Sequence, residues 1–152
     1  MTENSLAVAL ERLRVAFSSS VTVAELDSAV AKVAEHRDSA SIGPLLLLLD
    51  DSATYDEVMF SLIHAAEDFD DTIYVKAVLN VIADISVSAP KWASIVLMRI
   101  LNSASTKSAL VSALRSSGTE EKLAIRTLCE AINQRSAEFL AKTTPLLLAA
   151  QE

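Results

Sequence analysis

The sequence predicts an all-α protein, a short α-solenoid in which about nine helices stack as HEAT-like antiparallel pairs. Apolar residues recur at helical spacing along almost the whole chain. The 152 residues include only two glycines and three prolines, which disfavours turn-rich β folds and glycine-rich phosphate loops. Hydrophobic residues make up 51% of the chain, enough for one large core and too many for a disordered protein. We therefore expect a single domain over residues 1–152.

The first two helices are predicted from an apolar pattern and from a capping motif. Apolar residues lie on one stripe of a helix expected over about residues 4–17. Thr22 and Glu25 have the T-x-x-E spacing of a capping box, which satisfies free N–H groups at a helix start. A second helix is therefore expected to follow, ending at about residue 36.

The next two helices are marked by a proline and by a second capping motif. Pro44 would lie in the first turn of a helix over about residues 41–50, where its missing N–H costs little. Thr54 and Glu57 repeat the T-x-x-E spacing. They are expected to form a capping box that opens a helix over about residues 55–68.

The rest of the chain is predicted to form five more helices. Asp70 or Asp71 can cap the first of them, and Pro90 can start the second. Thr144 and Pro145 are expected to break or restart the last one. The expected ranges are about 71–86, 90–102, 105–116, 119–133 and 135–150.

A weak internal repeat favours stacked helix pairs. Residues 48–66 align with residues 113–131 at a constant offset of 65, which corresponds to about two units of 32 to 33 residues. A four-helix bundle would have fewer and longer helices. The spacing therefore favours a short stack of helix pairs.

The formal net charge of −7 is concentrated in one segment. Residues 38–75 contain nine acids and no Lys or Arg, whereas the rest of the chain has a small excess of bases. An acidic chain of this kind disfavours nucleic acid and anionic membranes as direct partners. It is compatible with a basic protein partner.

The acids of this segment have two interpretations. They can form a solvated helix face, because acids near helix starts are favoured by the macrodipole. On the helix expected over 55–68, helical spacing places Glu57, His64 and Asp68 opposite an apolar stripe, which consists of Val58, Leu62, Ile63 and Ala66. They can also form a binding surface for a basic partner, because no nearby base neutralises them and some would lie at an unfavourable helix C-terminus. We name the candidate surface the acidic face; its residues are Asp50, Asp51, Asp56, Glu57, His64, Glu67, Asp68, Asp70 and Asp71.

The sequence gives little support for catalysis, a metal site or a cofactor. His64, Glu67 and Asp68 have a spacing that could share a metal ion, but a di-metal helical bundle needs ligands from further helices. Cys129 lies on an apolar helix face without an adjacent base, as expected of a buried thiol. Nucleophile-elbow, phosphate-loop and zinc-protease motifs are absent. We therefore predict a non-enzymatic protein.

The helix expected over 90–102 is apolar almost all round, so it should be central. Trp92 is predicted to pack in the core. Arg99 needs a carboxylate partner, because an unpaired buried charge is costly. We expect an ion pair that ties this helix to the preceding acidic segment, with contact to a partner protein as the second possibility. The candidate carboxylates are Asp68, Glu67 and Asp56.

The N-terminal residues do not resemble a signal peptide, because charged residues interrupt the apolar ones. Even the longest purely apolar runs, such as that from Pro44 to Leu49, are far shorter than a membrane span. The single cysteine excludes an internal disulfide. We expect a soluble cytoplasmic protein. Its apolar C-terminal run, PLLLAA, is expected either to dock on the other helices or to support self-association as a homodimer.

Two segments of the chain carry a more specific pattern, YDEVMFSLIHAAEDFDDTIYVKAVL at 55–79 and PKWASIVLMRILNS at 90–103. They resemble the immunity protein 30 family. The similarity extends over about residues 5–145 and is sharpest over 55–103. The matching positions are Tyr55, Asp56, Glu57, His64, Glu67, Phe69, Asp70, Asp71, Tyr74, Trp92, Arg99 and Asn102.

The resemblance implies a small bacterial protein that binds a cognate toxin domain in the cytoplasm and blocks its active site or substrate access. Such proteins are encoded beside polymorphic or contact-dependent-inhibition toxins, several of which are basic nucleases. The acidic face would suit such a partner. Tyr55, Tyr74, Trp92 and Arg99 would then be structural or interface residues. The alternative is a HEAT-like adaptor in an unrelated assembly.

Overall fold

The computed structural model describes residues 5–19 and 21–152, and in these residues it contains helices and no strand. The all-α prediction is confirmed. Nine α-helices and two short 3₁₀ segments, at Ser39–Ser41 and Ala137–Phe139, follow one another in this part of the chain. The helices are α1 (Ser5–Phe17), α2 (Val23–Ala34), α3 (Ile42–Leu46), α4 (Asp56–Glu67), α5 (Asp71–Ser88), α6 (Pro90–Leu101), α7 (Ala104–Arg115), α8 (Thr119–Arg135) and α9 (Leu140–Gln151).

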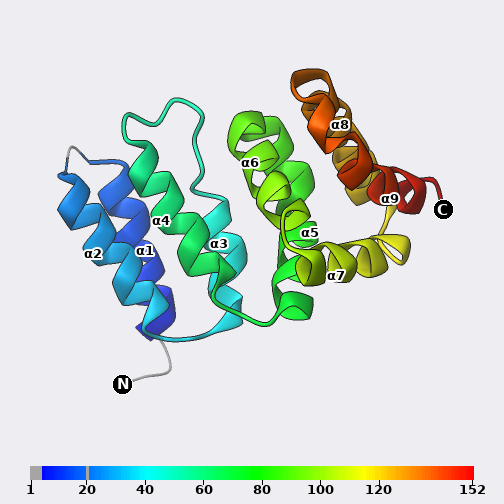
Figure 1. The fold of residues 1–152 in the computed structure, drawn as a ribbon. Coiled ribbons are helices and arrows are strands. Elements are labelled where there is room, and N and C mark those ends of the chain that lie inside the picture. Colours follow the sequence, from blue (N-terminus) through cyan, green and yellow to red (C-terminus); the bar gives the residue numbers. More distant parts are fainter. Residues whose placement is uncertain (1–4, 20) are drawn as a thin grey trace.

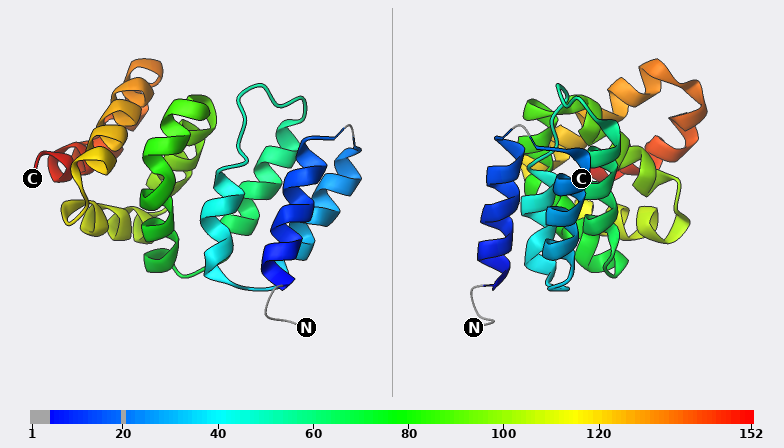
Figure 2. Two further views of the ribbon diagram at one scale, coloured as in Figure 1. Left: turned by 180° about the vertical axis from the view of Figure 1, so that it is seen from behind. Right: turned by 90° about the vertical axis from the view of Figure 1, so that its left-hand side faces the viewer.

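The first six helices form three antiparallel pairs of sequence neighbours. α1 packs on α2, α3 on α4, and α5 on α6 (Figure 1). Contacts of α2 with α4 and of α3 with α5 join successive pairs. As a result α2, α4 and α6 lie on one side of the molecule, and α1, α3 and α5 lie on the other (Figure 2).

The last three helices depart from this pairing. α7 runs across the ends of α5 and α6, while α8 packs on α5, α6 and α9 (Figure 1). The predicted stack of helix pairs does not extend to this end of the molecule, because α7 packs on α5 and α9 rather than on its sequence neighbour α8. A short connection after α6 and a hydrogen bond from Thr106 to Asp71 hold the start of α7 against the start of α5. The C-terminal helix docks on α7 and α8, with Leu146, Ala149 and Ala150 buried.

One of the two predicted capping boxes is present. The N–H of Glu25 donates to the Thr22 hydroxyl at 3.1 Å, and the N–H of Thr22 donates back to the Glu25 carboxylate at 3.5 Å. The second capping box, predicted at Thr54 and Glu57, does not form, so that prediction is wrong. α4 starts one residue later than that box requires, with Tyr55 as its N-cap residue and without a side-chain capping bond. The acids in its first turn interact favourably with the helix dipole instead.

The helix expected over 41–50 is also shorter than predicted. α3 ends at Leu46, and the chain continues as a turn and loop to Tyr55. Five consecutive leucines carry no helical period, so they did not define where the helix stops. The turn leaves Leu47 exposed and brings Leu49 back into the core, where it is 4% exposed.

Pro145 was expected to break the last helix, and it does not. It lies inside α9, which runs unbroken through it. The proline removes a single helix hydrogen bond near the start of α9, and the buried Thr143 and the neighbouring Thr144 donate their hydroxyls to the carbonyl of Leu140 in that turn.

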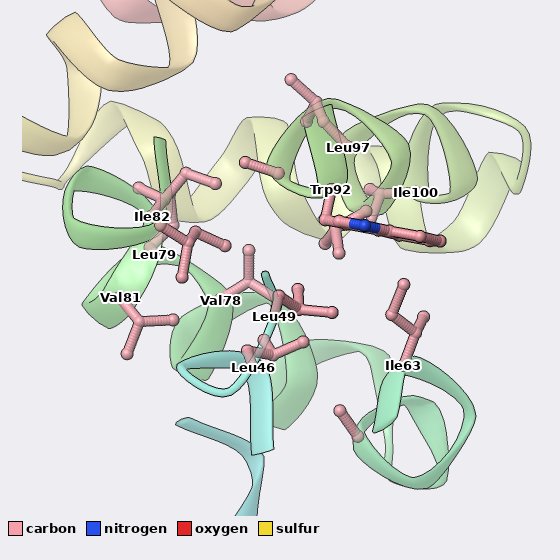
Figure 3. Close-up of a cluster of buried hydrophobic side chains, with 14 of the residues drawn as sticks. Leu46, Leu49, Ile63, Val78, Leu79, Val81, Ile82, Trp92, Leu97 and Ile100 are labelled. Carbon is pink, nitrogen blue, oxygen red and sulfur yellow. The ribbon is translucent and has the colours of Figure 1, made fainter. Parts of the chain in front are cut away.

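The core is a continuous cluster of buried side chains that extends from α1 to α9. One part of this core lies where α3, α4, α5 and α6 meet (Figure 3). Trp92 is 1% exposed there, which confirms its predicted core role, and its ring is nearly perpendicular to that of Phe60, with the ring centroids 5.1 Å apart. Such aromatic pairs favour a fixed spacing of the helices that carry them, here α4 and α6.

Candidate functional site

The acidic face is built around α4, which lies between α2 and α6 on one side of the molecule (Figure 1). The inner stripe of the helix is buried, as predicted, at Val58, Leu62, Ile63 and Ala66. On its outer side Glu57, His64 and Asp68 are exposed. The predicted division of this helix into an apolar and a polar side is therefore correct.

The remaining exposed acids lie at the two ends of α4. Asp50 and Asp56 belong to the loop that precedes the helix and to its first turn, and Asp70 lies in the connection that follows it. The 12 residues of α4 separate the two ends by about 18 Å, at about 1.5 Å per residue. The exposed carboxylates therefore extend along one elongated surface rather than forming a compact cluster.

A neighbouring helix adds to this surface. The hydroxyl of Ser61, on the outer side of α4, donates to the carboxylate of Asp27 in α2 at 2.8 Å. Asp27 lies outside the acidic segment, so the charge pattern of the sequence did not include it. The negative surface thus extends from α4 onto α2.

The Asp51 side chain makes hydrogen bonds to another part of the same chain. Its two carboxylate oxygens accept hydrogen bonds from the backbone N–H groups of Lys91 and Trp92, at 3.0 and 3.2 Å. These N–H groups belong to the first turn of α6, whose own N-cap residue, Ala89, makes no side-chain cap. Asp51 therefore caps α6 from a distant loop. The expectation that Asp50 and Asp51 lie at a helix C-terminus is wrong, because α3 has already ended.

The predicted ion pair of Arg99 is present, and its partner is Glu67. The guanidinium donates through two nitrogens to the two carboxylate oxygens, both at 2.8 Å. The side chains are 36% and 25% exposed, so the pair is partly shielded from water. The hydrogen bonds to Glu67 raise the pKa of Arg99, which stays charged. The pair ties the end of α4 to α6.

Asp71 also makes an internal contact. One of its oxygens accepts a hydrogen bond from the Thr106 hydroxyl at 2.8 Å, and that hydroxyl lies 3.0 Å from the hydroxyl of Ser103. Asp70 precedes α5 as its N-cap residue, as predicted, but its side chain makes no capping bond and is exposed. Asp71 thus links the start of α5 to the start of α7.

A polar pocket lies where α4 and α6 end and α5 and α7 begin. Its volume is about 400 Å³. Tyr74 lines it and is only 3% exposed, and its hydroxyl has no hydrogen-bond partner. Burial raises the pKa of Tyr74, so the phenol remains protonated. We call this site the polar pocket; its lining residues are Glu67, Asp71, Tyr74, Arg99, Ile100, Asn102, Ser103 and Thr106.

A known protein family matches the part of the chain that carries this surface. The family model of immunity protein 30 matches residues 14–110, which is more than half of the chain. The chain belongs to the immunity protein 30 family. Searches of curated proteins and of solved structures found no match.

The part of this immunity-family protein that matches the family model runs from α1 into α7. It includes the whole of α4, both ends of the acidic face and every lining residue of the polar pocket. α8 and α9 lie outside the match. One residue of α9 still reaches the rim of the pocket, because the Lys142 ammonium donates to the side-chain oxygen of Asn102 at 2.6 Å.

The structure brings together residues that sequence reasoning did not connect. Thr106, Ser103 and Asp27 were not selected, because isolated hydroxyl groups and a single acid on another helix carry no pattern. Tyr74 was selected only through the family resemblance. The placement of α7 across α5 decides which of these groups meet, and no sequence pattern predicted that placement.

Two further features of this immunity-family protein concern its single thiol and its potential metal ligands. Burial raises the pKa of the Cys129 thiol to about 12, which makes it a poor nucleophile. In the described part of the chain, no group of three or more His, Cys, Asp and Glu side chains could hold a metal ion. Among the same residues, no helix combines the length and hydrophobicity needed to cross a membrane.

A larger and more apolar groove, of about 870 Å³, lies between α1 and α2. It is lined by Val8, Ala9, Ala24 and Ala29, with charged residues at its rim. None of the acids of the acidic face lines it. The groove is therefore separate from the candidate site.

Proposed function

We propose that this protein is a non-catalytic inhibitor that binds a cognate bacterial toxin domain in the cytoplasm. Membership of the immunity protein 30 family carries this proposal. In the proposed setting, the toxin belongs to a polymorphic or contact-dependent-inhibition system, and the immunity protein protects the cell that makes it and its siblings.

The proposed interface is the exposed part of the acidic face. It includes Asp50, Asp56, Glu57, His64, Asp68 and Asp70, all of which are exposed. Asp51, Glu67 and Asp71 support this surface from within, because each binds another element of the same chain. Tyr55, which is 47% exposed at the start of α4, adds an aromatic side chain to the same surface.

Charge complementarity supports a basic partner. The exposed carboxylates would attract a positively charged domain and accelerate the encounter, and opposing charges would favour the correct partner over others. If the toxin is a nuclease, the surface that holds its nucleic acid must itself be basic. Carboxylates on α4 would then compete for the groups that bind phosphates, and the toxin would lose access to its substrate.

The fold supports this kind of binding. The side of the molecule formed by α2, α4 and α6 is built from helices whose positions are fixed by core packing, by the Glu67–Arg99 pair and by the Asp51 cap. A surface on helices that are already ordered loses little conformational entropy when it binds. Tight association does not then require large rearrangement.

Co-expression with the toxin domain encoded beside this gene tests the proposal. The toxin domain expressed alone should stop growth, and growth should be restored when this protein is present. A toxin domain that still kills in the presence of the folded protein would exclude the proposed function. Recovery of the protein in a stable multiprotein complex without any toxin would favour the adaptor instead.

A further inference from the structure

The polar pocket has a property that the packing of the helices does not explain. It contains a buried hydrogen-bond donor without an acceptor, the Tyr74 hydroxyl, next to the Glu67–Arg99 pair. Buried polar groups are nearly always hydrogen-bonded, because an unpaired one loses its bonds to water and gains nothing. A donor left unpaired beside a pocket therefore points to a ligand that carries an acceptor.

Two other side chains of the polar pocket have hydrogen-bonding atoms without a partner. Arg99 donates to Glu67 through Nε and one terminal nitrogen, and its second terminal nitrogen makes no hydrogen bond to the described residues. Asp71 accepts the Thr106 hydroxyl on one oxygen, which leaves its second oxygen as an acceptor. The pocket thus offers donors at Tyr74 and Arg99 and an acceptor at Asp71.

The charge of the polar pocket restricts what can enter. Glu67 and Arg99 neutralise each other, and the Lys142 ammonium lies at the rim on Asn102, so the charge inside the pocket is that of Asp71. A second carboxylate placed against the free oxygen of Asp71 would be repelled. A cation would be attracted by Asp71 but would meet the Arg99 guanidinium and would satisfy neither donor. A neutral group that has both an acceptor and a donor meets all of these conditions.

We propose that the polar pocket receives a neutral carboxamide, the side chain of an asparagine or glutamine of the toxin. Its oxygen would accept a hydrogen bond from Arg99 and, once a side chain at the pocket wall shifts, from the Tyr74 hydroxyl, which is closed to water in the structure. Its NH₂ group would donate to the second oxygen of Asp71. The source of the carboxamide rests on the proposed function, whereas the chemistry of the pocket does not. Asp68 and Asp70 directly neighbour the lining residues Glu67 and Asp71 in the chain, so a toxin bound on this end of the acidic face would be close to the pocket.

Small probes test the chemistry without the toxin. The full chain, labelled with ¹⁵N, would be titrated with propionamide, propionate and propylammonium, and the signals of the Arg99 Nε–H group and the Thr106 amide would be followed by NMR. Propionamide should bind saturably and at least tenfold more tightly than the two charged probes. The variant Tyr74→Phe should bind propionamide at least tenfold more weakly. The second tyrosine provides the matched control for this titration, because Tyr55→Phe removes an exposed hydroxyl at the opposite end of α4 and should leave propionamide binding unchanged.

Three outcomes of the titration would overturn the inference. Propionate or propylammonium could bind as tightly as propionamide, propionamide could fail to bind saturably, or Tyr74→Phe could bind it as well as the natural protein does. Circular dichroism of each variant verifies that the helices are intact.

Affinity for the toxin domain tests the source of the carboxamide. Tyr74→Phe should raise the Kd for the toxin domain of the neighbouring gene about tenfold. If the natural protein binds that domain and Tyr74→Phe binds it equally well, the inference is overturned and the proposed function stands. If the natural protein does not bind the domain at all, the proposed function and the toxin as source both fail, and the titration alone decides whether the pocket takes a carboxamide.

Discussion

The carboxylate of Asp51 accepts a hydrogen bond from the backbone N–H of Trp92, 41 residues further along the chain, at 3.2 Å. The same carboxylate accepts the N–H of Lys91. A loop residue between α3 and α4 thus caps α6, which lacks a cap of its own. The contact links two helix pairs and fixes the end of α6 that carries the central tryptophan.

Loss of this cap should destabilise the protein. Asp51→Ala should lower the free energy of unfolding by about 1–2 kcal/mol, the usual cost of losing a helix cap. Asp50→Ala is the matched control, because Asp50 is exposed and accepts only the local N–H of Ser52. Urea unfolding of both variants measures the difference, and an equal loss in the two would contradict the assigned role of Asp51.

The ion pair between Glu67 and Arg99 should contribute through its coupling rather than through either residue alone. The pair is bidentate but partly exposed, so we expect a coupling free energy of about 1 kcal/mol. A double-mutant cycle with Glu67→Gln and Arg99→Met, monitored by urea unfolding, isolates this quantity. A coupling indistinguishable from zero would mean that the pair only positions the two side chains of the polar pocket.

The Arg99 pair could be predicted from the sequence and the Asp51 cap could not, for a physical reason. Arg99 interrupts an apolar helix, so its need for a carboxylate is visible locally, and an acidic segment supplies the candidates. Asp51 gave no such signal, because its partners are backbone N–H groups that become neighbours only when the loop folds against α6. The run of leucines before it concealed the end of α3 as well.

The same distinction applies to the candidate site. The exposed acids of α4 follow from helical spacing, and their exposure agrees with it. The polar pocket depends on α7 lying across α5, which brings Thr106 to Asp71. No local pattern encodes that crossing. A pocket made by four helix ends could therefore not be predicted from the sequence alone.

Removing the unpaired hydroxyl of Tyr74 should stabilise the protein. Tyr74→Phe keeps the ring in place and removes a buried donor that has no acceptor, so we expect the free energy of unfolding to rise by about 1 kcal/mol. Tyr55→Phe, at an exposed position, should leave stability unchanged. Thermal unfolding of the two variants checks this. A loss of stability in Tyr74→Phe would mean that the hydroxyl has a hydrogen bond in solution.

Stability should fall at alkaline pH because of Cys129. Its pKa is about 12 in the folded protein against an ordinary value of 9.0, so above pH 9 the unfolded chain loses a proton that the folded chain keeps. The free energy of unfolding should then fall by about 1.4 kcal/mol per pH unit above pH 9. Below pH 9 the Cys129 thiol is protonated in both states and should not affect stability. The raised pKa of Tyr74 acts in the same direction above pH 10.0.

Urea unfolding between about pH 8 and 11 measures this dependence. The variant Cys129→Ala should have a shallower slope than the natural protein, whatever its absolute stability. An identical slope in the two would show that the thiol titrates in the folded protein as it does in the unfolded chain.

Charge reversal on the acidic face should slow association with the toxin. The double variant Glu57→Lys and Asp68→Lys places two bases on the exposed side of α4, at its two ends. Because charges at an interface mainly govern the encounter rate, we expect the association rate constant to fall about tenfold at low salt and its salt dependence to weaken.

A second double variant separates local charge from net charge. Asp84→Lys and Glu130→Lys change the net charge by the same amount at exposed positions on α5 and α8, outside the acidic face. Their association rate should remain close to that of the natural protein. Melting temperatures must be measured alongside, because Glu57 lies in the first turn of α4 and its reversal also removes a favourable interaction with the helix dipole. If the two double variants slow association equally, the rate depends only on the total charge of the molecule. The interface would then lie outside the acidic face.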